Sequence, residues 1–95
     1  MPILGEAMKL KEGFILKKIL DDYIVVPTGD NIVDFAVAVS LNESGAFLWE
    51  QLSEEKTIFE LADALALEYN VSSEEVIGDV AEFAELLKTH DFLAQ

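Results

Sequence analysis

Residues 35–52 constrain the fold more than any other segment, because an uncharged alternating strand runs directly into a capped helix. Large side chains alternate with small ones over this strand: Phe35, Val37, Val39 and Leu41 against Ala36, Ala38 and Ser40. The period of two predicts a strand with one face suited to a core. Natural edge strands are usually blunted by lysine or proline, and the segment between Asp34 and Glu43 contains neither. At a sheet edge it would be open to an incoming peptide strand, which favours a peptide-binding module over an enzyme.

Turn signals divide the first half of the chain into three predicted strands. The first covers Phe14–Leu20, with Ile15 and Ile19 on one face, and the second covers Tyr23–Val26. Pro27 to Asn31 is a turn signal, and the third strand follows over Val33–Ser40. Three neighbouring strands of this kind predict an antiparallel meander.

Capping residues divide the second half into three predicted helices. Asn42 is a suitable N-cap for the first helix, and Thr57–Glu60 is a capping box for the second. Ser72–Glu75 is another capping box and opens a third helix that runs to about Thr89. We therefore expect an α+β, winged-helix-like fold, in which a three-stranded antiparallel sheet precedes a three-helix bundle. One domain would cover residues 1–95, with a loosely ordered N-terminus over residues 1–12.

The third helix has a broader apolar face than a single core requires. At 100° per residue its central stripe contains Val76, Val80, Phe83, Ala84 and Leu87. Ile77 widens the stripe on one flank and Leu86 on the other, so the arc exceeds the ~100° of a typical amphipathic helix. We expect Val80 and Leu87 to lie in the core, whereas Phe83 and Leu86 fit either the core or a groove.

The charge balance excludes some partners. Nineteen acids and six lysines, with no arginine, give a formal net charge of −13. Nucleic-acid binding draws much of its affinity from basic side chains at phosphates, and the third helix carries five acids against Lys88. A winged-helix DNA-binding regulator is therefore the weakest alternative, and a neutral or basic partner fits better.

Side chains for catalysis or metal binding are sparse. The chain has no cysteine, and its single histidine, His90, falls at the end of the last helix without a visible partner. Adjacent acids such as Asp21-Asp22 lack the spacing of a calcium loop. We predict no enzymatic activity, no cofactor and no metal site. The sequence also contains no signal peptide and no apolar run long enough to span a membrane, and a cytoplasmic protein is the simplest expectation.

The chain resembles the PqqD family, whose members are also called RiPP recognition elements, over residues 9–93. The resemblance rests on an ordered combination of cap and core segments: Val39–Trp49, Thr57–Ala62, Tyr69–Val71, Asp79–Phe83 and Leu87. No single one of these motifs is diagnostic.

The resemblance implies binding of the leader segment of a ribosomally made precursor peptide, which the domain presents to a modifying enzyme. It further implies that the leader adds as a strand to the third β-strand and rests against the third helix. Asp79 would either pair with a basic leader residue or cap locally, and Trp49 is expected in the core. The peptide-binding residues expected on this basis are Ala36, Val37, Ala38, Val39, Ser40, Leu41, Val76, Asp79, Val80, Phe83, Leu86 and Leu87.

Two questions of partnership stay open at this level. The modifying enzyme would be a lasso-peptide protease, a radical SAM enzyme or another maturase. We expect a monomer, but an unguarded edge also allows two copies to pair or to swap strands. A self-associating scaffold domain is therefore the main alternative function.

Overall fold

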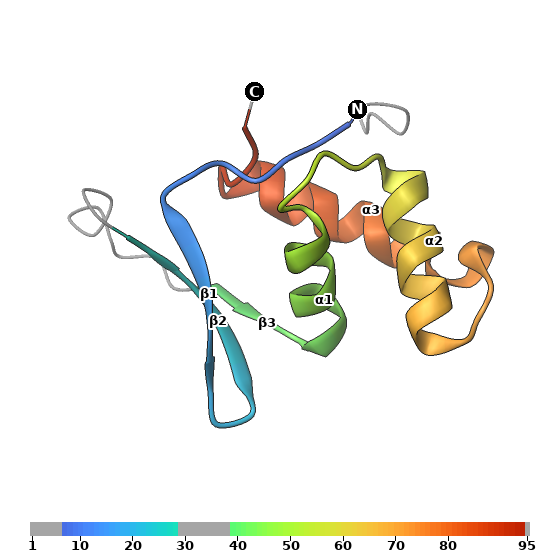
Figure 1. The fold of residues 1–95 in the computed structure, drawn as a ribbon, viewed down its shortest axis with the longest axis horizontal. Helices are drawn as coiled ribbons and strands as arrows, with labels where there is room; N and C mark the ends of the chain where they lie inside the picture. Colours follow the sequence, from blue (N-terminus) through green and yellow to red (C-terminus); the bar gives the residue numbers. More distant parts are fainter. Residues whose placement is uncertain (1–6, 29–38, 95) are drawn as a thin grey trace.

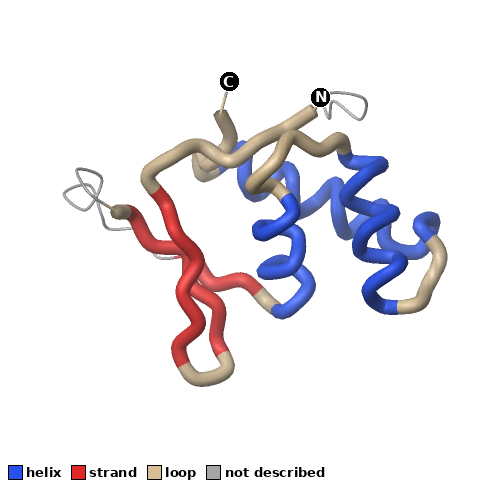
Figure 2. The backbone as a smooth tube through the Cα atoms, in the orientation of Figure 1, coloured by secondary structure: helices blue, strands red, loops and turns tan. Residues whose placement is uncertain are grey.

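The computed structural model describes residues 7–28 and 39–94, and within them three strands precede three helices (Figure 1). This order confirms the predicted α+β arrangement. The strands lie together on one side of the molecule and the helices on the other (Figure 2). The elements are β1 (Phe14–Ile19), β2 (Asp22–Pro27), β3 (Val39–Leu41), α1 (Glu43–Gln51), α2 (Ile58–Tyr69) and α3 (Ser73–Thr89).

The sheet is an antiparallel meander with the order β1-β2-β3. β3 pairs with β2 through Val25 opposite Val39 and Ile24 opposite Ser40. Among the described residues no strand lies on the other side of β3, so β3 is an edge strand. The part of the predicted third strand that covers residues 33–38 lies outside the described residues.

The first strand is shorter than predicted. It ends at Ile19, and Leu20 adopts φ 58° in the two-residue turn to β2, where its side chain is 89% exposed. The two-residue hairpin turn requires a left-handed backbone at this point. Leu20 therefore lies in the turn and is exposed, although its apolar side chain favoured a position in the strand. The prediction that the strand extends to Leu20 was therefore wrong.

The three predicted N-cap residues all cap their helices, although the capping box predicted over Ser72–Glu75 forms only the bond to the Ser72 side chain. The Gly45 N–H donates to Asn42 Oδ1 over 2.8 Å at the start of α1. Thr57 and Glu60 form a reciprocal capping box before α2, and Asn70 ends that helix in the left-handed conformation. Ser72 Oγ accepts from the Glu75 N–H at the start of α3. Each cap pairs a backbone donor that the first turn of a helix leaves free, so the helix boundaries follow from local sequence.

The hydrophobic core lies where the three helices meet the inner face of the sheet. Leu52, Leu61, Val80 and Leu87 have no exposed surface, and Val25 brings β2 into the same cluster. Trp49 is 6% exposed and packs edge-to-face on Phe92, with ring centroids 5.6 Å apart. This burial confirms the core positions expected for Val80, Leu87 and Trp49.

The N-terminal segment is bound more firmly than expected. Met8 and Lys56 exchange backbone hydrogen bonds, and the Lys11 N–H donates to the Phe92 carbonyl over 2.7 Å. Lys11 also forms an ion pair with Asp91. Residues 8–11 therefore differ from the loose N-terminus expected over residues 1–12, because they pair with segments far along the chain.

Two helical glycines offer a matched pair of substitutions. A Cβ at Gly45 would lie 3.1 Å from Asn42 Oδ1 and 3.3 Å from Leu41 Cβ, whereas a Cβ at Gly78 in α3 would meet nothing within 4 Å. Gly78→Ala should raise the free energy of unfolding by about 0.5–1 kcal/mol, because alanine loses less backbone entropy in a helix. Gly45→Ala should lower it, because the new methyl group presses on the cap. Urea unfolding of both variants checks this, and an equal gain at both sites would contradict the tight packing at Gly45.

Candidate functional site

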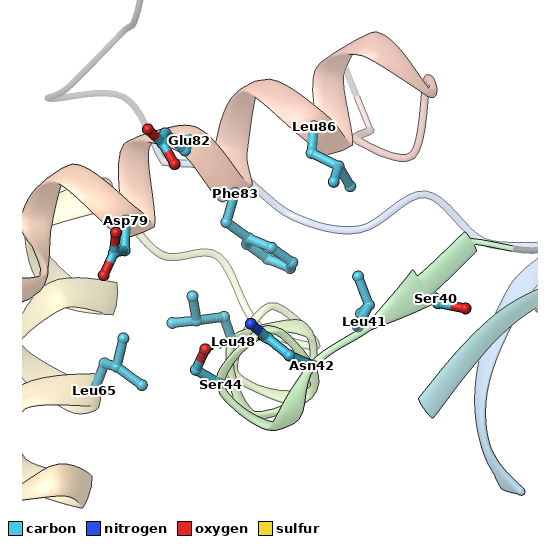
Figure 3. Close-up of a pocket in the computed structure, with 10 residues that line it drawn as sticks. All are labelled: Ser40, Leu41, Asn42, Ser44, Leu48, Leu65, Asp79, Glu82, Phe83 and Leu86. Carbon is cyan, nitrogen blue, oxygen red and sulfur yellow. Dashed lines mark hydrogen bonds between the residues drawn. The ribbon is translucent and has the colours of Figure 1, made fainter. Parts of the chain in front are cut away.

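A groove of about 370 Å³ separates α3 from β3 and the start of α1 (Figure 3). We call it the β3–α3 groove. It combines the edge strand, one helix terminus and one face of a second helix. Its lining residues are Ser40, Leu41, Asn42, Ser44, Leu48, Leu65, Asp79, Glu82, Phe83 and Leu86.

One face of α3 forms the first wall. Asp79, Glu82, Phe83 and Leu86 follow the spacing i, i+3, i+4 and i+7, so they lie on the same side of the helix. Phe83 and Leu86 point from α3 toward β3 and the start of α1 (Figure 3). Phe83 is 9% exposed and Leu86 is half-buried, and both pack with the core. The apolar part of this wall is therefore a rigid extension of the core.

The strand-to-helix junction forms the second wall. Leu41 is buried at the end of β3, and Asn42 caps α1 immediately after it. A Cβ at Gly45 would lie 3.5 Å from Phe83 Cε1, so the ring packs close to the α1 backbone. The Phe83 ring therefore lies beside the first turn of α1 at the base of the groove.

The groove carries negative charge along its α3 wall. The side chains of Asp79 and Glu82 are exposed, and neither forms a salt bridge within residues 7–28 and 39–94. Nor does Asp79 cap a helix locally, since Ser72 supplies the cap of α3. The groove thus presents apolar surface from Leu41, Phe83 and Leu86 beside two carboxylates, which suits an extended segment with apolar side chains and a neutral or basic character.

The groove brings together five of the residues predicted for peptide binding: Ser40, Leu41, Asp79, Phe83 and Leu86. Val39 lies next to them in β3, where it is half-buried against the core. The predicted residues Ala36, Val37 and Ala38 lie outside the described residues.

Three residues predicted for the site belong to the core instead. Val80 and Leu87 have no exposed surface, Val76 is 8% exposed, and none of the three lines the groove. The side of α3 that carries them packs on α2 in the core, whereas the side from Asp79 to Leu86 reaches the groove.

Sequence reasoning missed five lining residues: Asn42, Ser44, Leu48, Leu65 and Glu82. For Glu82 a signal was available, because it shares a helical face with Asp79 and Leu86. Asn42 and Ser44 could also have been found, since a helix that starts directly after an edge strand places its first turn beside that edge. Leu65 lies on α2 and reaches the groove only through the packing of the helices.

The described residues contain no cluster of histidine, aspartate or glutamate side chains arranged to hold a metal ion. His90 is exposed and its ring stacks on that of Phe92, with the ring centroids 5.6 Å apart. No helix among the described residues is long and apolar enough to cross a membrane.

Two solved structures have a similar fold. One is described as "TbiB1 in Complex with the TbiA(beta) Leader Peptide", with a TM-score of 0.70, 24% sequence identity, and coverage of 90% of this chain and 94% of that chain. The other is the solution structure of the PqqD truncation of Methylobacterium extorquens PqqCD, described as a functional, stand-alone RiPP recognition element. Its TM-score is 0.77 at 11% identity, with coverage of 100% of this chain and 96% of that chain. At these identities the likeness concerns the fold.

A family model supplies evidence at the level of sequence. No curated protein matches the chain significantly. The model for coenzyme PQQ synthesis protein D (PqqD) matches residues 30–93, which is most of the chain and includes β3, all three helices and every residue that lines the groove. With a fold that agrees, this match shows that the chain belongs to the PqqD family.

Proposed function

We propose that this domain binds the leader segment of a ribosomally made, post-translationally modified precursor peptide in the β3–α3 groove and presents it to a modifying enzyme. The observation that carries the proposal is the groove itself, in which an edge strand faces an apolar helix flank. Family membership and the leader peptide bound to the similarly folded TbiB1 support it.

Strand addition explains how such a groove holds a peptide. Backbone groups on the open side of β3 would pair with those of the leader and give affinity that tolerates sequence variation. Alternate leader side chains would point toward Leu41, Phe83 and Leu86, where burial of an apolar side chain contributes about 1.5–3 kcal/mol. The other edge of the sheet is less suited to this role, because β1 carries Lys17 and Lys18.

The proposal assigns binding to this chain and chemistry to its partner. We infer that the modifying enzyme is a separate protein or domain of the maturase class, and that the encounter takes place in the cytoplasm, where precursor peptides are synthesised. The domain itself would act as a monomeric carrier of the leader, without cofactor and without catalysis.

Titration of the ¹⁵N-labelled protein with a synthetic leader, taken from the precursor encoded beside its gene, tests the proposal. We expect saturable amide shifts at residues 39–41 and along the α3 face from Asp79 to Leu86. Shifts that map elsewhere would contradict the groove. An absence of shifts together with a concentration-dependent dimer in light scattering would instead favour the self-associating scaffold.

Leu86 and Ile77 allow binding to be separated from stability. Both are half-buried on the flanks of α3 and pack against the core, but only Leu86 lines the groove. Leu86→Ala should weaken leader binding by about tenfold or more, because contact with an apolar leader side chain is lost. Ile77→Ala should leave the affinity unchanged while also lowering the free energy of unfolding. Calorimetric titration and urea unfolding of both variants give the comparison, and equal affinities would refute a role for Leu86.

The acidic wall predicts a charge preference. Asp79→Lys should weaken binding of a leader that carries a basic residue by about fivefold at low salt, as expected for the loss of an exposed ion pair. Glu85→Lys makes the same change of charge on an exposed part of α3 outside the groove. Fluorescence anisotropy at two salt concentrations measures both variants. If Glu85→Lys weakens binding as much as Asp79→Lys, the effect belongs to the overall field of the domain rather than to the groove.

A further inference from the structure

A second hollow lies on another face of α1. It is walled by the rings of Tyr23, Phe47 and Tyr69, and we call it the aromatic pocket. Its remaining lining residues are Glu43, Ala46, Glu50 and Glu68. The α1 residues among them follow the spacing i, i+3, i+4 and i+7, whereas Ser44 and Leu48 face the β3–α3 groove. The two sites share a helix but no lining residue.

The walls of the aromatic pocket are available to a ligand. Tyr69 is 41% exposed, and Tyr23 and Phe47 are half-buried. The chain itself places a cation at one of these rings, since Lys18 Nζ lies 5.6 Å from the centroid of Tyr23. Aromatic faces attract cations through their quadrupole, and arginine is the commonest partner. The rings therefore suit a cationic side chain better than a neutral one.

The rim of the pocket adds carboxylates to the rings. Glu43 and Glu50 extend from α1 and Glu68 from α2, and all three are exposed. None of them forms a salt bridge within the part of the chain that the structure describes. Burial and the nearby charges of Glu43 and Glu68 raise the pKa of Tyr69 above its usual value of 10.0. Burial is the larger cause, and the contribution of the two carboxylates fits a negative potential inside the pocket.

The size of the pocket limits its occupant. Its volume is about 210 Å³, below the ~300–1,000 Å³ of typical small-molecule sites. A single long side chain fits this space better than a cofactor does. Arginine matches each wall, because its planar guanidinium group stacks on aromatic faces and pairs with carboxylates.

We propose that the aromatic pocket binds an arginine side chain on the surface of a partner protein. Since its lining is separate from that of the β3–α3 groove, a partner protein can dock there while the groove is occupied. The inference does not depend on leader binding. It assigns a role to Tyr23, Phe47 and Tyr69, three residues that do not line the groove.

A short peptide serves as the probe. The full-length ¹⁵N-labelled protein is titrated at low salt with Ac-Ala-Arg-Ala-NH₂ and, separately, with the citrulline analogue, which keeps the shape but lacks the charge. We expect saturable amide shifts confined to Tyr23, residues 43–50 and residues 68–69 with the arginine peptide, and none with citrulline. Equal shifts with both peptides, or shifts spread along the acids of α3, would overturn the proposal.

Charge-matched variants complete the test. Glu50→Gln/Glu68→Gln removes two rim carboxylates and should weaken arginine-peptide binding by about fivefold. Glu54→Gln/Glu55→Gln removes the same charge from exposed residues outside the pocket and should leave the affinity unchanged. Near-identical amide spectra of the two variants away from the substituted sites verify that both are folded. If both double variants bind the arginine peptide equally weakly, the binding depends on net charge and the proposed site in the aromatic pocket is refuted.

Discussion

The hydrogen bond from the Gly45 N–H to Asn42 Oδ1 is the interaction on which the site depends. It ends β3 and begins α1 at a single residue, so that the edge strand and the first helical turn lie side by side. A side chain at position 45 would press on Asn42 Oδ1 and Leu41 Cβ, and the Phe83 ring of α3 lies beside the same turn. A longer or looser connection would separate β3 from α3, and the groove between them would lose its second wall.

Helix α3 divides its faces between the core and the groove. Val80 and Leu87 are fully buried in the core, where the helix packs on α2. The adjacent face, from Asp79 to Leu86, lines the groove. Phe83 stands at the boundary and belongs to both. A groove wall that continues the core in this way is held in place by packing, and under the proposed function this would reduce the entropy lost on binding.

The sequence predicted the parts of this structure that depend on local interactions. Asn42, Thr57 and Ser72 begin the helices as predicted, because capping needs only residues within one turn. Long-range features were not predictable. Residues near the N-terminus form backbone hydrogen bonds with Lys56 and Phe92. Leu65 lines the groove because α2 packs beside it. The hydrophobic periodicity of a single segment does not indicate which distant segments it will contact.

The same limit applied to the site. The width of the apolar arc on α3 indicated that one flank lines a groove, as the lining of Phe83 and Leu86 confirms. It did not tell which of the predicted peptide-binding residues line the groove, and Val76, Val80 and Leu87 do not. The aromatic pocket was missed altogether, since its lining comes from β2, α1 and α2. Fold alone does not establish function, and the functional conclusion therefore rests on the groove and on family membership together.

Intermolecular NOEs between isotope-labelled protein and unlabelled leader peptide test the central claim most directly. Strand addition at β3 predicts cross-strand contacts between leader backbone protons and those of Val39, Ser40 and Leu41, with leader side chains near Phe83 and Leu86. Backbone NOEs to β1 instead, or side-chain contacts at the groove without any backbone pairing to β3, would contradict it.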